Sequence, residues 1–193
     1  FSTFTKRIVK IANLDLPGEA SHYKMAPIER LQELTKQSLK KNKAKKAAVM
    51  VLFYPNQDDE TLLALILRNT YKGVHSAQVG FPGGKQEPSD ISAEHTALRE
   101  TQEEVGIHER FIDAAGVIEP YLTVTDFHVV PIVGFVKPDF TLEIDPFEVA
   151  EVFEVPLSLL ADPSKYQLRE IFWKEEWREY FELMYKGHRI WGA

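Results

Sequence analysis

The chain has 193 residues, of which 44% are hydrophobic and 27% are charged, with no cysteine and a formal net charge of −6 at pH 7. These values are typical of a globular domain, and they exclude disulfide bonds, thiolate nucleophiles and cysteine-ligated metal sites. The longest apolar run, Ala47 to Tyr54, has only the length of a strand, so we expect no membrane-spanning helix. The lack of cysteine fits a reducing compartment, and we expect a cytoplasmic protein.

Positive charge is concentrated in the first quarter of the chain. Residues 1–46 contain 11 Lys and Arg residues against four Asp and Glu residues, whereas residues 47–193 contain 12 against 25. The lysines between Lys40 and Lys46 are first interpreted as a solvated helix end, where cations suit the helix dipole. The alternative is a patch that attracts a phosphorylated ligand. Nucleic-acid binding would require a more basic domain, so we expect none.

Predicted helices and strands alternate along the chain. Apolar residues at helical spacing predict a helix over 25–42, and two apolar runs predict a strand hairpin over 47–54 and 61–68. A glycine-rich loop follows over 69–84, and a second helix over 92–105 ends before a C-terminal glycine. The remaining predictions are strands at 113–122, 129–136 and 148–155, a short helix at 156–161, and either two strands or a strand and a helix at 167–173 and 177–185. This order predicts a mixed sheet flanked by helices.

Three carboxylates lie on one face of the helix predicted over 92–105. Glu100, Glu103 and Glu104 have the spacing i, i+3 and i+4, at which like charges destabilise an exposed helix by about 0.2–0.5 kcal/mol per pair. Arg99 can offset Glu103, but the only cationic candidate beside Glu104 is His108. The arrangement is locally unfavourable unless a divalent cation binds there.

A solvated acidic face is the simplest interpretation of three glutamates on a helix. Two glycines before the helix, Gly83 and Gly84, favour a metal site instead, because glycine permits close backbone approach and its carbonyl oxygen can complete a metal shell. Mg²⁺ and Mn²⁺ prefer such hard oxygen ligands, and Mg²⁺ is commonly bound by few carboxylates together with substrate phosphates. We therefore expect Mg²⁺ or Mn²⁺ at Gly84, Glu100, Glu103 and Glu104.

The segment from Gly84 to Ile107 resembles the Nudix box, in which a glycine-led loop is followed by Arg-Glu-hydrophobic-any-Glu-Glu-any-Gly-hydrophobic. Arg99-Glu100-Thr101-Gln102-Glu103-Glu104-Val105-Gly106-Ile107 supplies the second half. The chain departs from the pattern in three ways: Asp90 replaces a glutamate, eight residues rather than seven separate it from Arg99, and Thr101 replaces an apolar residue.

The residues before the box resemble the coenzyme A pyrophosphatase branch of this family. The matching stretches are Leu65-Ile66-Leu67-Arg68 and His75-Ser76-Ala77-Gln78-Val79-Gly80-Phe81-Pro82-Gly83-Gly84. The resemblance covers residues 47–193. It implies a Nudix fold, an α/β/α sandwich around a mixed β-sheet, in a single domain over 1–193, with 1–46 as a basic N-terminal helical extension and 47–193 as the catalytic core.

The resemblance further implies hydrolysis of the pyrophosphate bond of coenzyme A or its thioesters. The products would be 4′-phosphopantetheine, or its acylated form, and adenosine 3′,5′-bisphosphate. Arg99 would orient a neighbouring glutamate, and the general base would be Glu100 or a late carboxylate, Glu148 or Glu151. The substrate-binding candidates are Arg68, His75, Gln78 and Lys85. We also expect one or more of Lys43, Lys45 and Lys46 to contact the 3′-phosphate.

Two other functions stay open. The chain could act on another nucleoside diphosphate derivative, such as ADP-ribose or a dinucleoside polyphosphate, or it could be a non-catalytic Nudix module that binds nucleotides. The intact set of acids on the helix, Glu100, Glu103 and Glu104, argues against the second, since a pure binder has no need for acids that repel one another. The expected partner is a small nucleotide substrate, with a homodimer left open. Trp191-Gly192-Ala193 resembles the start of a longer C-terminal motif, so we expect further residues beyond it.

Overall fold

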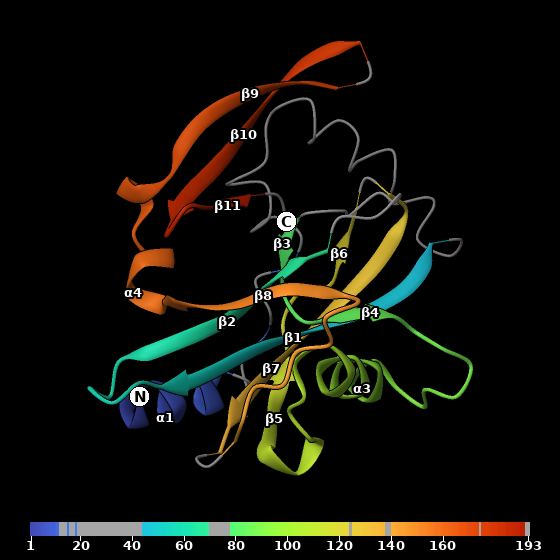
Figure 1. Ribbon diagram of the computed structural model, residues 1–193, viewed down its shortest axis with the longest axis vertical. Helices are drawn as coiled ribbons and strands as arrows, with labels where there is room; N and C mark the ends of the chain where they lie inside the picture. Colours follow the sequence, from blue (N-terminus) through green and yellow to red (C-terminus); the bar gives the residue numbers. More distant parts are fainter. Residues whose placement is uncertain are drawn as a thin grey trace.

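The computed structural model describes residues 1–11, 15, 18, 44–69, 78–123, 125–137, 140–173 and 175–191. A mixed sheet forms its centre (Figure 1). Its long strands have the order β8-β2-β1-β7-β5, and the short strands β3, β4 and β6 pair with β2, β1 and β7. The bounds are β1 Lys45–Pro55, β2 Thr61–Arg68, β3 Val79–Gly80, β4 Gly83–Lys85, β5 Ile112–Val117, β6 Tyr121–Leu122, β7 Phe127–Val136 and β8 Val149–Pro156.

The two central strands are apolar along most of their length because both faces of the sheet are covered. On β1, Met50, Leu52 and Tyr54 face the core beneath α3 (Ala93–Val105), while Val51 and Phe53 face the core on the opposite side. β1 pairs in parallel with β7 and in antiparallel with β2, so the predicted hairpin is confirmed. The sheet thus separates two cores.

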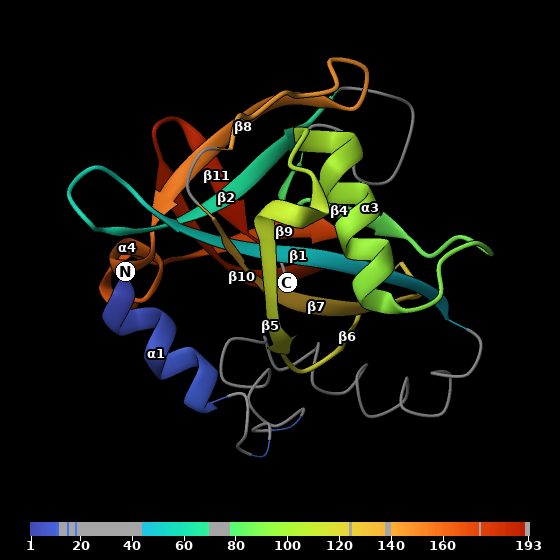
Figure 2. The ribbon, with the colours of Figure 1, turned by 90° about the horizontal axis from the view of Figure 1, so that it is seen from below.

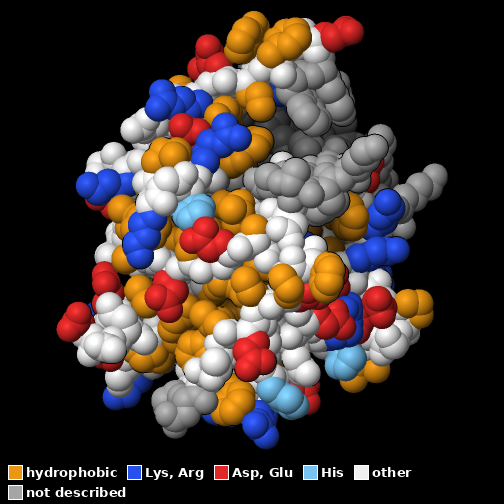
Figure 3. Space-filling model, in the orientation of Figure 1, with side chains coloured by type: hydrophobic (Ala, Val, Ile, Leu, Met, Phe, Trp, Pro, Cys, Tyr) orange, Lys and Arg blue, Asp and Glu red, His pale blue; other side chains and the backbone are white. Residues whose placement is uncertain are grey.

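The face opposite α3 is covered by a second sheet and by short helices (Figures 1 and 2). Strands β9 Gln167–Trp173, β10 Glu176–Tyr185 and β11 His188–Trp191 form an antiparallel sheet in the order β11-β10-β9. Tyr185 and Ile190 pack into the same core as Phe153 of β8. The helix α4 Leu157–Leu160 and the 3₁₀ turns η3 Glu109–Phe111 and η4 Pro163–Lys165 complete the connections. Hydrophobic side chains remain exposed where β9 meets β10 (Figure 3), among them Phe172 and Trp177.

An N-terminal helix, α1 Ser2–Ile11, packs on this same face. The ring of Phe4 lies 4.9 Å from that of Phe53 in an edge-to-face arrangement, a geometry that adds to the hydrophobic contribution of burying the rings. The N-terminal amine donates a hydrogen bond to the carbonyl oxygen of Asp59 at 2.9 Å. Helix α1 therefore closes one end of the second core.

Most predicted elements are confirmed, and two details are wrong. The strand predicted over 113–122 is two strands, β5 and β6, because the chain has one extra residue between the pairs Val117–Ile132 and Tyr121–Val129, which interrupts the ladder with β7. The glycine-rich loop contains the short strands β3 and β4. Both late elements are strands, which resolves the open alternative. The helix predicted over 25–42 lies outside the described residues. None of the described helices is long and apolar enough to cross a bilayer.

Candidate active site

The candidate site is built from β4, the loop after it and α3. Ser92 caps the helix, since its hydroxyl oxygen accepts a hydrogen bond from the N–H of His95 at 3.0 Å. Gly106 ends it with φ 74°, as predicted for a C-terminal glycine. The glycine strand β4 pairs with β1 through Ala48–Gly84 and Val49–Gly83. This pairing fixes the glycines beside the helix that carries the glutamates.

Asp90 is the structural centre of this unit. Its side chain is buried, and its oxygens accept hydrogen bonds from the N–H of Glu87 at 2.9 Å, the hydroxyl of Thr96 at 3.0 Å, and Nε and Nη2 of Arg99, each at 3.0 Å. Nδ1 of His95 also lies 3.0 Å away. The Arg99 guanidinium, assisted by these other donors, outweighs burial and holds the pKa of Asp90 well below its usual range. Sequence reasoning left the role of this residue open.

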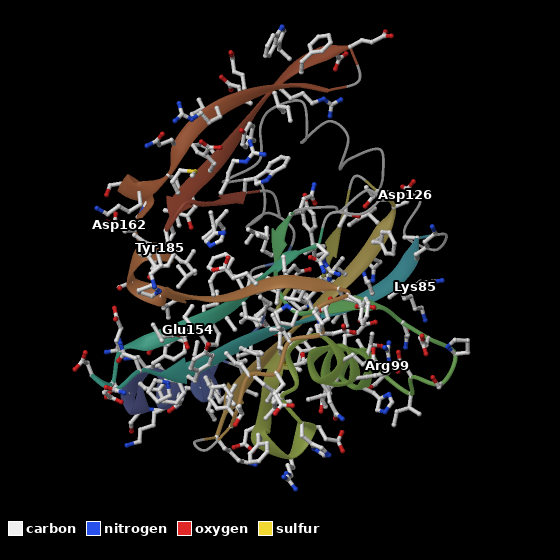
Figure 4. All side chains as sticks on the ribbon, viewed as in Figure 1. Lys85, Arg99, Asp126, Glu154, Asp162 and Tyr185 are labelled. Atoms are coloured by element: carbon white, nitrogen blue, oxygen red, sulfur yellow. The ribbon has the colours of Figure 1, made fainter. Side chains whose placement is uncertain are left out.

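Arg99 connects the loop to the carboxylates of the helix (Figure 4). Besides Asp90, its guanidinium donates to Glu103 Oε2 at 2.8 Å, Glu100 Oε1 at 3.0 Å and the carbonyl oxygen of Lys85 at 3.2 Å. The hydrogen bond with Asp90 contributes most to raising the pKa of Arg99, so the guanidinium is charged. Arg99 thus contacts the neighbouring glutamates, in line with the orienting role suggested by the resemblance.

The carboxylate of Glu100 lies directly against the backbone of Gly84. A Cβ atom on Gly84 would come within 2.5 Å of all three carboxylate atoms, so any side chain there would displace the end of Glu100. Gly83 is also required, because its φ of 147° is unfavourable for other residues and a Cβ would lie 2.4 Å from the carbonyl oxygen of Ala48. Burial, with smaller contributions from Glu103 and Glu148, raises the pKa of Glu100 despite the opposing effect of Arg99.

Glu104 is fully buried beneath β4. Its Oε2 accepts a hydrogen bond from the N–H of Gly83 at 2.7 Å, and its Oε1 lies 2.9 Å from Nη1 of Arg68. Burial raises the pKa of Glu104 to about 7, with Arg68 and the Gly83 N–H acting in the opposite direction. The prediction that only His108 could offset Glu104 is wrong. Arg68 does so from β2, 36 positions earlier in the chain.

The other end of the Arg68 guanidinium donates to the carbonyl oxygen of Gly83 at 2.5 Å. Arg68 therefore braces Glu104 and the glycine loop in this structure, and its expected contact with substrate stays a prediction. The carbonyl oxygen of Gln78 accepts a hydrogen bond from the N–H of Arg68 at 3.0 Å, which places Gln78 beside the same strand end. Lys85 follows the glycines with an exposed side chain. His75 lies outside the described residues.

The two late carboxylates have different surroundings. Glu148 is exposed and close enough to Glu100 and Glu104 to raise the pKa of both. Glu151 pairs across the strands with Leu67 on the opposite face, and its Oε1 lies 3.3 Å from Nε2 of His188 in β11. The structure therefore brings Glu148 to the helix carboxylates and does not bring Glu151 there.

The donor set fits a hard divalent cation. Among the described residues, no three His, Asp or Glu side chains already converge as a metal site, but Mg²⁺ commonly takes one or two carboxylates and completes its shell with waters and substrate phosphates. Glu100, seated on the Gly84 backbone, offers a carboxylate beside a main-chain strand edge, and Glu148 adds negative charge nearby. These oxygens suit Mg²⁺ or Mn²⁺ better than softer metals.

The chain has relatives among known proteins. Residues 44–174 match the family described as NUDIX domain. NudL of Photorhabdus laumondii, called an uncharacterized Nudix hydrolase, is 37% identical over 130 residues, which span 67% of this chain and 70% of the relative. NudL of Escherichia coli K12 is 34% identical over 67% of this chain and 68% of its own length. Among solved structures, an Ap4A hydrolase of C. elegans aligns over 59% of this chain and 81% of its own, with a TM-score of 0.49 and 16% identity.

Proposed function

The chain belongs to the Nudix hydrolase family, and from this premise we propose that it hydrolyses the diphosphate bond of coenzyme A or its thioesters. The products are 4′-phosphopantetheine, or its acylated form, and adenosine 3′,5′-bisphosphate. Nudix hydrolases generally use divalent metal ions and act on small nucleotides, and we propose Mg²⁺ or Mn²⁺ as the ion here. A bound ion would neutralise the diphosphate and lower the pKa of a coordinated water.

The observation that carries the proposal is the Glu100 carboxylate held against Gly84 by Arg99. Nη2 of Arg99 donates to Oε1 of Glu100 at 3.0 Å, while Nε and Nη1 of Arg99 donate to Asp90 and Glu103. A carboxylate fixed in this way loses little freedom when a ligand binds, and phosphoryl-transfer catalysis consists mostly of such positioning and charge stabilisation.

Each residue of the site has a proposed role. Glu100 and Gly84 provide oxygen ligands, and Glu103 and Glu104 are proposed to complete the acidic set. Both carboxylate oxygens of Glu104 already have a partner within the protein, since Arg68 contacts one and the N–H of Gly83 contacts the other. Its main effect is therefore to hold the glycine loop in place.

The general base is proposed to be Glu100 or Glu148. Both lie close to Glu104, since each contributes to raising its pKa, and a general base must reach the attacking water directly or through one other water. Glu151 is disfavoured in this role, since it lies on the opposite face and contacts His188.

The coenzyme A assignment is supported by the sequence around the glycine loop. The stretch Gln78–Gly84 ends in the strand that contacts Glu100, and Arg68 precedes it on β2. These are the positions at which the chain resembles coenzyme A pyrophosphatases. The names of the curated relatives specify the family and no substrate.

The direct test is product analysis by mass spectrometry after incubation with Mg²⁺ and coenzyme A, dephospho-coenzyme A, ADP-ribose or diadenosine tetraphosphate. We expect 4′-phosphopantetheine from coenzyme A. Glu100→Gln should lower kcat by about 10²-fold or more, because it weakens both the oxygen ligand and the candidate base. Glu94→Gln is the matched control, since Glu94 is an exposed glutamate in the first turn of the same helix. Equal activity of Glu100→Gln and the wild type would contradict the proposed role.

A further inference from the structure

Lys45 and Lys85 project from the same face of the central sheet. Lys85 pairs with Ala47 across β4 and β1, so its side chain lies on the side of Ala47 and, two residues along the strand, of Lys45. This is the face of Val51 and Phe53, opposite α3. Diagonal neighbours of this kind have α-carbons about 7–8 Å apart in antiparallel strands. The two lysines therefore form a short row that begins next to Gly84.

The Lys45 ammonium is held over the sheet by an aromatic ring. Its Nζ lies 5.4 Å from the ring centroid of Phe127, the residue that pairs with Lys45 on β7. A contact of this type contributes about 0.5–1 kcal/mol at an exposed site. Neither Lys45 nor Lys85 has an ion-pair partner within the part of the chain that the structure describes, and both side chains are exposed. Among the described residues, nothing therefore competes with an anion for these two charges.

Lys46 points the other way. It alternates with Lys45 on β1 and shares the face of Ala48 and Met50, beneath α3. The sequence alone could not separate Lys43, Lys45 and Lys46 as candidates for phosphate contact. The register of β1 now favours Lys45 and makes Lys46 a natural control, whereas Lys43 lies outside the described residues.

Gly84, Lys85 and Lys45 follow one another along the sheet, as the diphosphate and the 3′-phosphate follow one another along coenzyme A. β4 pairs with β1 and with no other strand of the described segments, so a ligand at its outer edge can reach Glu100 on one face and the lysines on the other. The diphosphate of coenzyme A is separated from its 3′-phosphate by one ribose. A phosphate monoester carries a charge of about −1.5 to −2 at pH 7, and the net charge of residues 47–193 is negative, so this group requires a local cation.

We propose that Lys45 binds the 3′-phosphate of coenzyme A, while Lys85 contacts the diphosphate beside Gly84. This inference rests on the proposed function, because the 3′-phosphate is what distinguishes coenzyme A from dephospho-coenzyme A. Lys45 is accordingly the residue that makes the enzyme prefer a nucleotide with a phosphate at the 3′ position. The exposed contact should weaken as salt concentration rises.

The test compares Lys45→Ala, Lys85→Ala and the control Lys46→Ala on coenzyme A and dephospho-coenzyme A. Lys45→Ala should raise KM for coenzyme A about tenfold or more, the range for loss of one charge-assisted hydrogen bond, and leave KM for dephospho-coenzyme A unchanged. Lys85→Ala should impair both substrates, and Lys46→Ala neither. An equal effect of Lys45→Ala on both substrates, or the same selective effect from Lys46→Ala, would overturn the inference.

A binding measurement separates failure of this inference from failure of the proposed function. If the wild type cleaves neither coenzyme A nor dephospho-coenzyme A, the proposed function is wrong whatever Lys45 does. Calorimetric titration with adenosine 3′,5′-bisphosphate and with AMP then tests the lysine alone. Tighter binding of the bisphosphate that Lys45→Ala abolishes and Lys46→Ala retains supports the site. Equal affinity for the two nucleotides overturns it.

Discussion

Replacement of Asp90 by asparagine tests whether this buried carboxylate holds the loop and helix together. Asparagine keeps the shape of the side chain but removes its charge and turns one acceptor oxygen into a donor NH₂ group. In the wild type both oxygens accept, from the N–H of Glu87, the hydroxyl of Thr96 and two nitrogens of Arg99. Every orientation of the new amide therefore turns its NH₂ group toward at least one of these donors.

The expected loss of stability follows from burial and from the partners that remain. Removing one partner of a buried ion pair costs about 3–5 kcal/mol. Arg99 keeps its contacts with Glu100 and Glu103 after the change, and it is 19% exposed as a side chain. The lower end, about 3 kcal/mol, is therefore expected. In a chain of this size about 1 kcal/mol lowers Tm by about 2–4 °C, which gives a decrease of about 6–12 °C.

The same residue predicts a pH dependence with a defined sign. The folded-state pKa of Asp90 lies below its usual range, chiefly because of its hydrogen bonds with Arg99. Its stabilisation is therefore complete above the unfolded-state pKa of about 3.9 and is lost as pH falls further toward the folded-state value. The difference in unfolding free energy between wild type and Asp90→Asn should be constant from pH 6 to 8 and should shrink below about pH 4.

Urea unfolding followed by circular dichroism at pH 7, 5 and 3.5 measures both effects. Asp113→Asn is the matched control, because Asp113 forms an exposed ion pair with Lys137 at 2.7 Å and should change stability by less than about 1 kcal/mol. A loss of less than 0.5 kcal/mol for Asp90→Asn at pH 7, or a loss of the full size that persists unchanged at pH 3.5, would refute the reasoning.

Two further predictions concern Gly84 and the N-terminal helix. Gly84→Ala places a Cβ within 2.5 Å of the Glu100 carboxyl group, so the flexible end of Glu100 must move, and we expect kcat to fall about 10²-fold while stability changes by about 1 kcal/mol or less. Gly80→Ala, which meets open space, should keep its activity, and equal kcat for the two variants would contradict the close approach. Phe4→Ala should lower the unfolding free energy by about 2 kcal/mol, roughly half the value for a fully buried phenylalanine; Phe147→Ala, at a side chain 89% exposed, should not, and an unchanged Cm for Phe4→Ala would show that α1 does not hold the second core closed.

The elements of this fold that depend on local signals could be predicted from the sequence. Helix α3 combines a serine cap, a periodic apolar face and a C-terminal glycine, and all three signals lie within 15 consecutive residues. The β1–β2 hairpin is similarly local, since Asn56 in its turn accepts hydrogen bonds from the N–H groups of Asp58 and Glu60. The Nudix pattern over Arg99–Ile107 is also a contiguous stretch, so it located the helix with Glu100, Glu103 and Glu104 from the sequence alone.

The contacts that define the site join distant positions, and no local signal specifies them. Arg68 reaches Glu104 because β2 and α3 meet beneath the glycine loop. Glu148 lies just before β8, where its carbonyl oxygen accepts a hydrogen bond from the N–H of Asn69 at the end of β2, and it lies close to Glu100 and Glu104. Glu151 lies within β8 and pairs with Leu67, and no local signal indicates which of these two carboxylates approaches the helix. The buried setting of Asp90 could have been suspected from Thr96 and Arg99, two hydrogen-bond donors that lie three residues apart on the helix that follows it.

The ratio of kcat/KM for coenzyme A to kcat/KM for ADP-ribose, measured with the wild type and Mg²⁺ at pH 7.5, tests the central claim most directly. Both compounds contain a diphosphate linked to adenosine, so the fixed Glu100–Gly84 arrangement can act on either, and only recognition beyond the diphosphate separates them. We predict a ratio of about 10²-fold or more in favour of coenzyme A, with 4′-phosphopantetheine as product. A ratio of one or below would contradict the assignment of coenzyme A as the substrate.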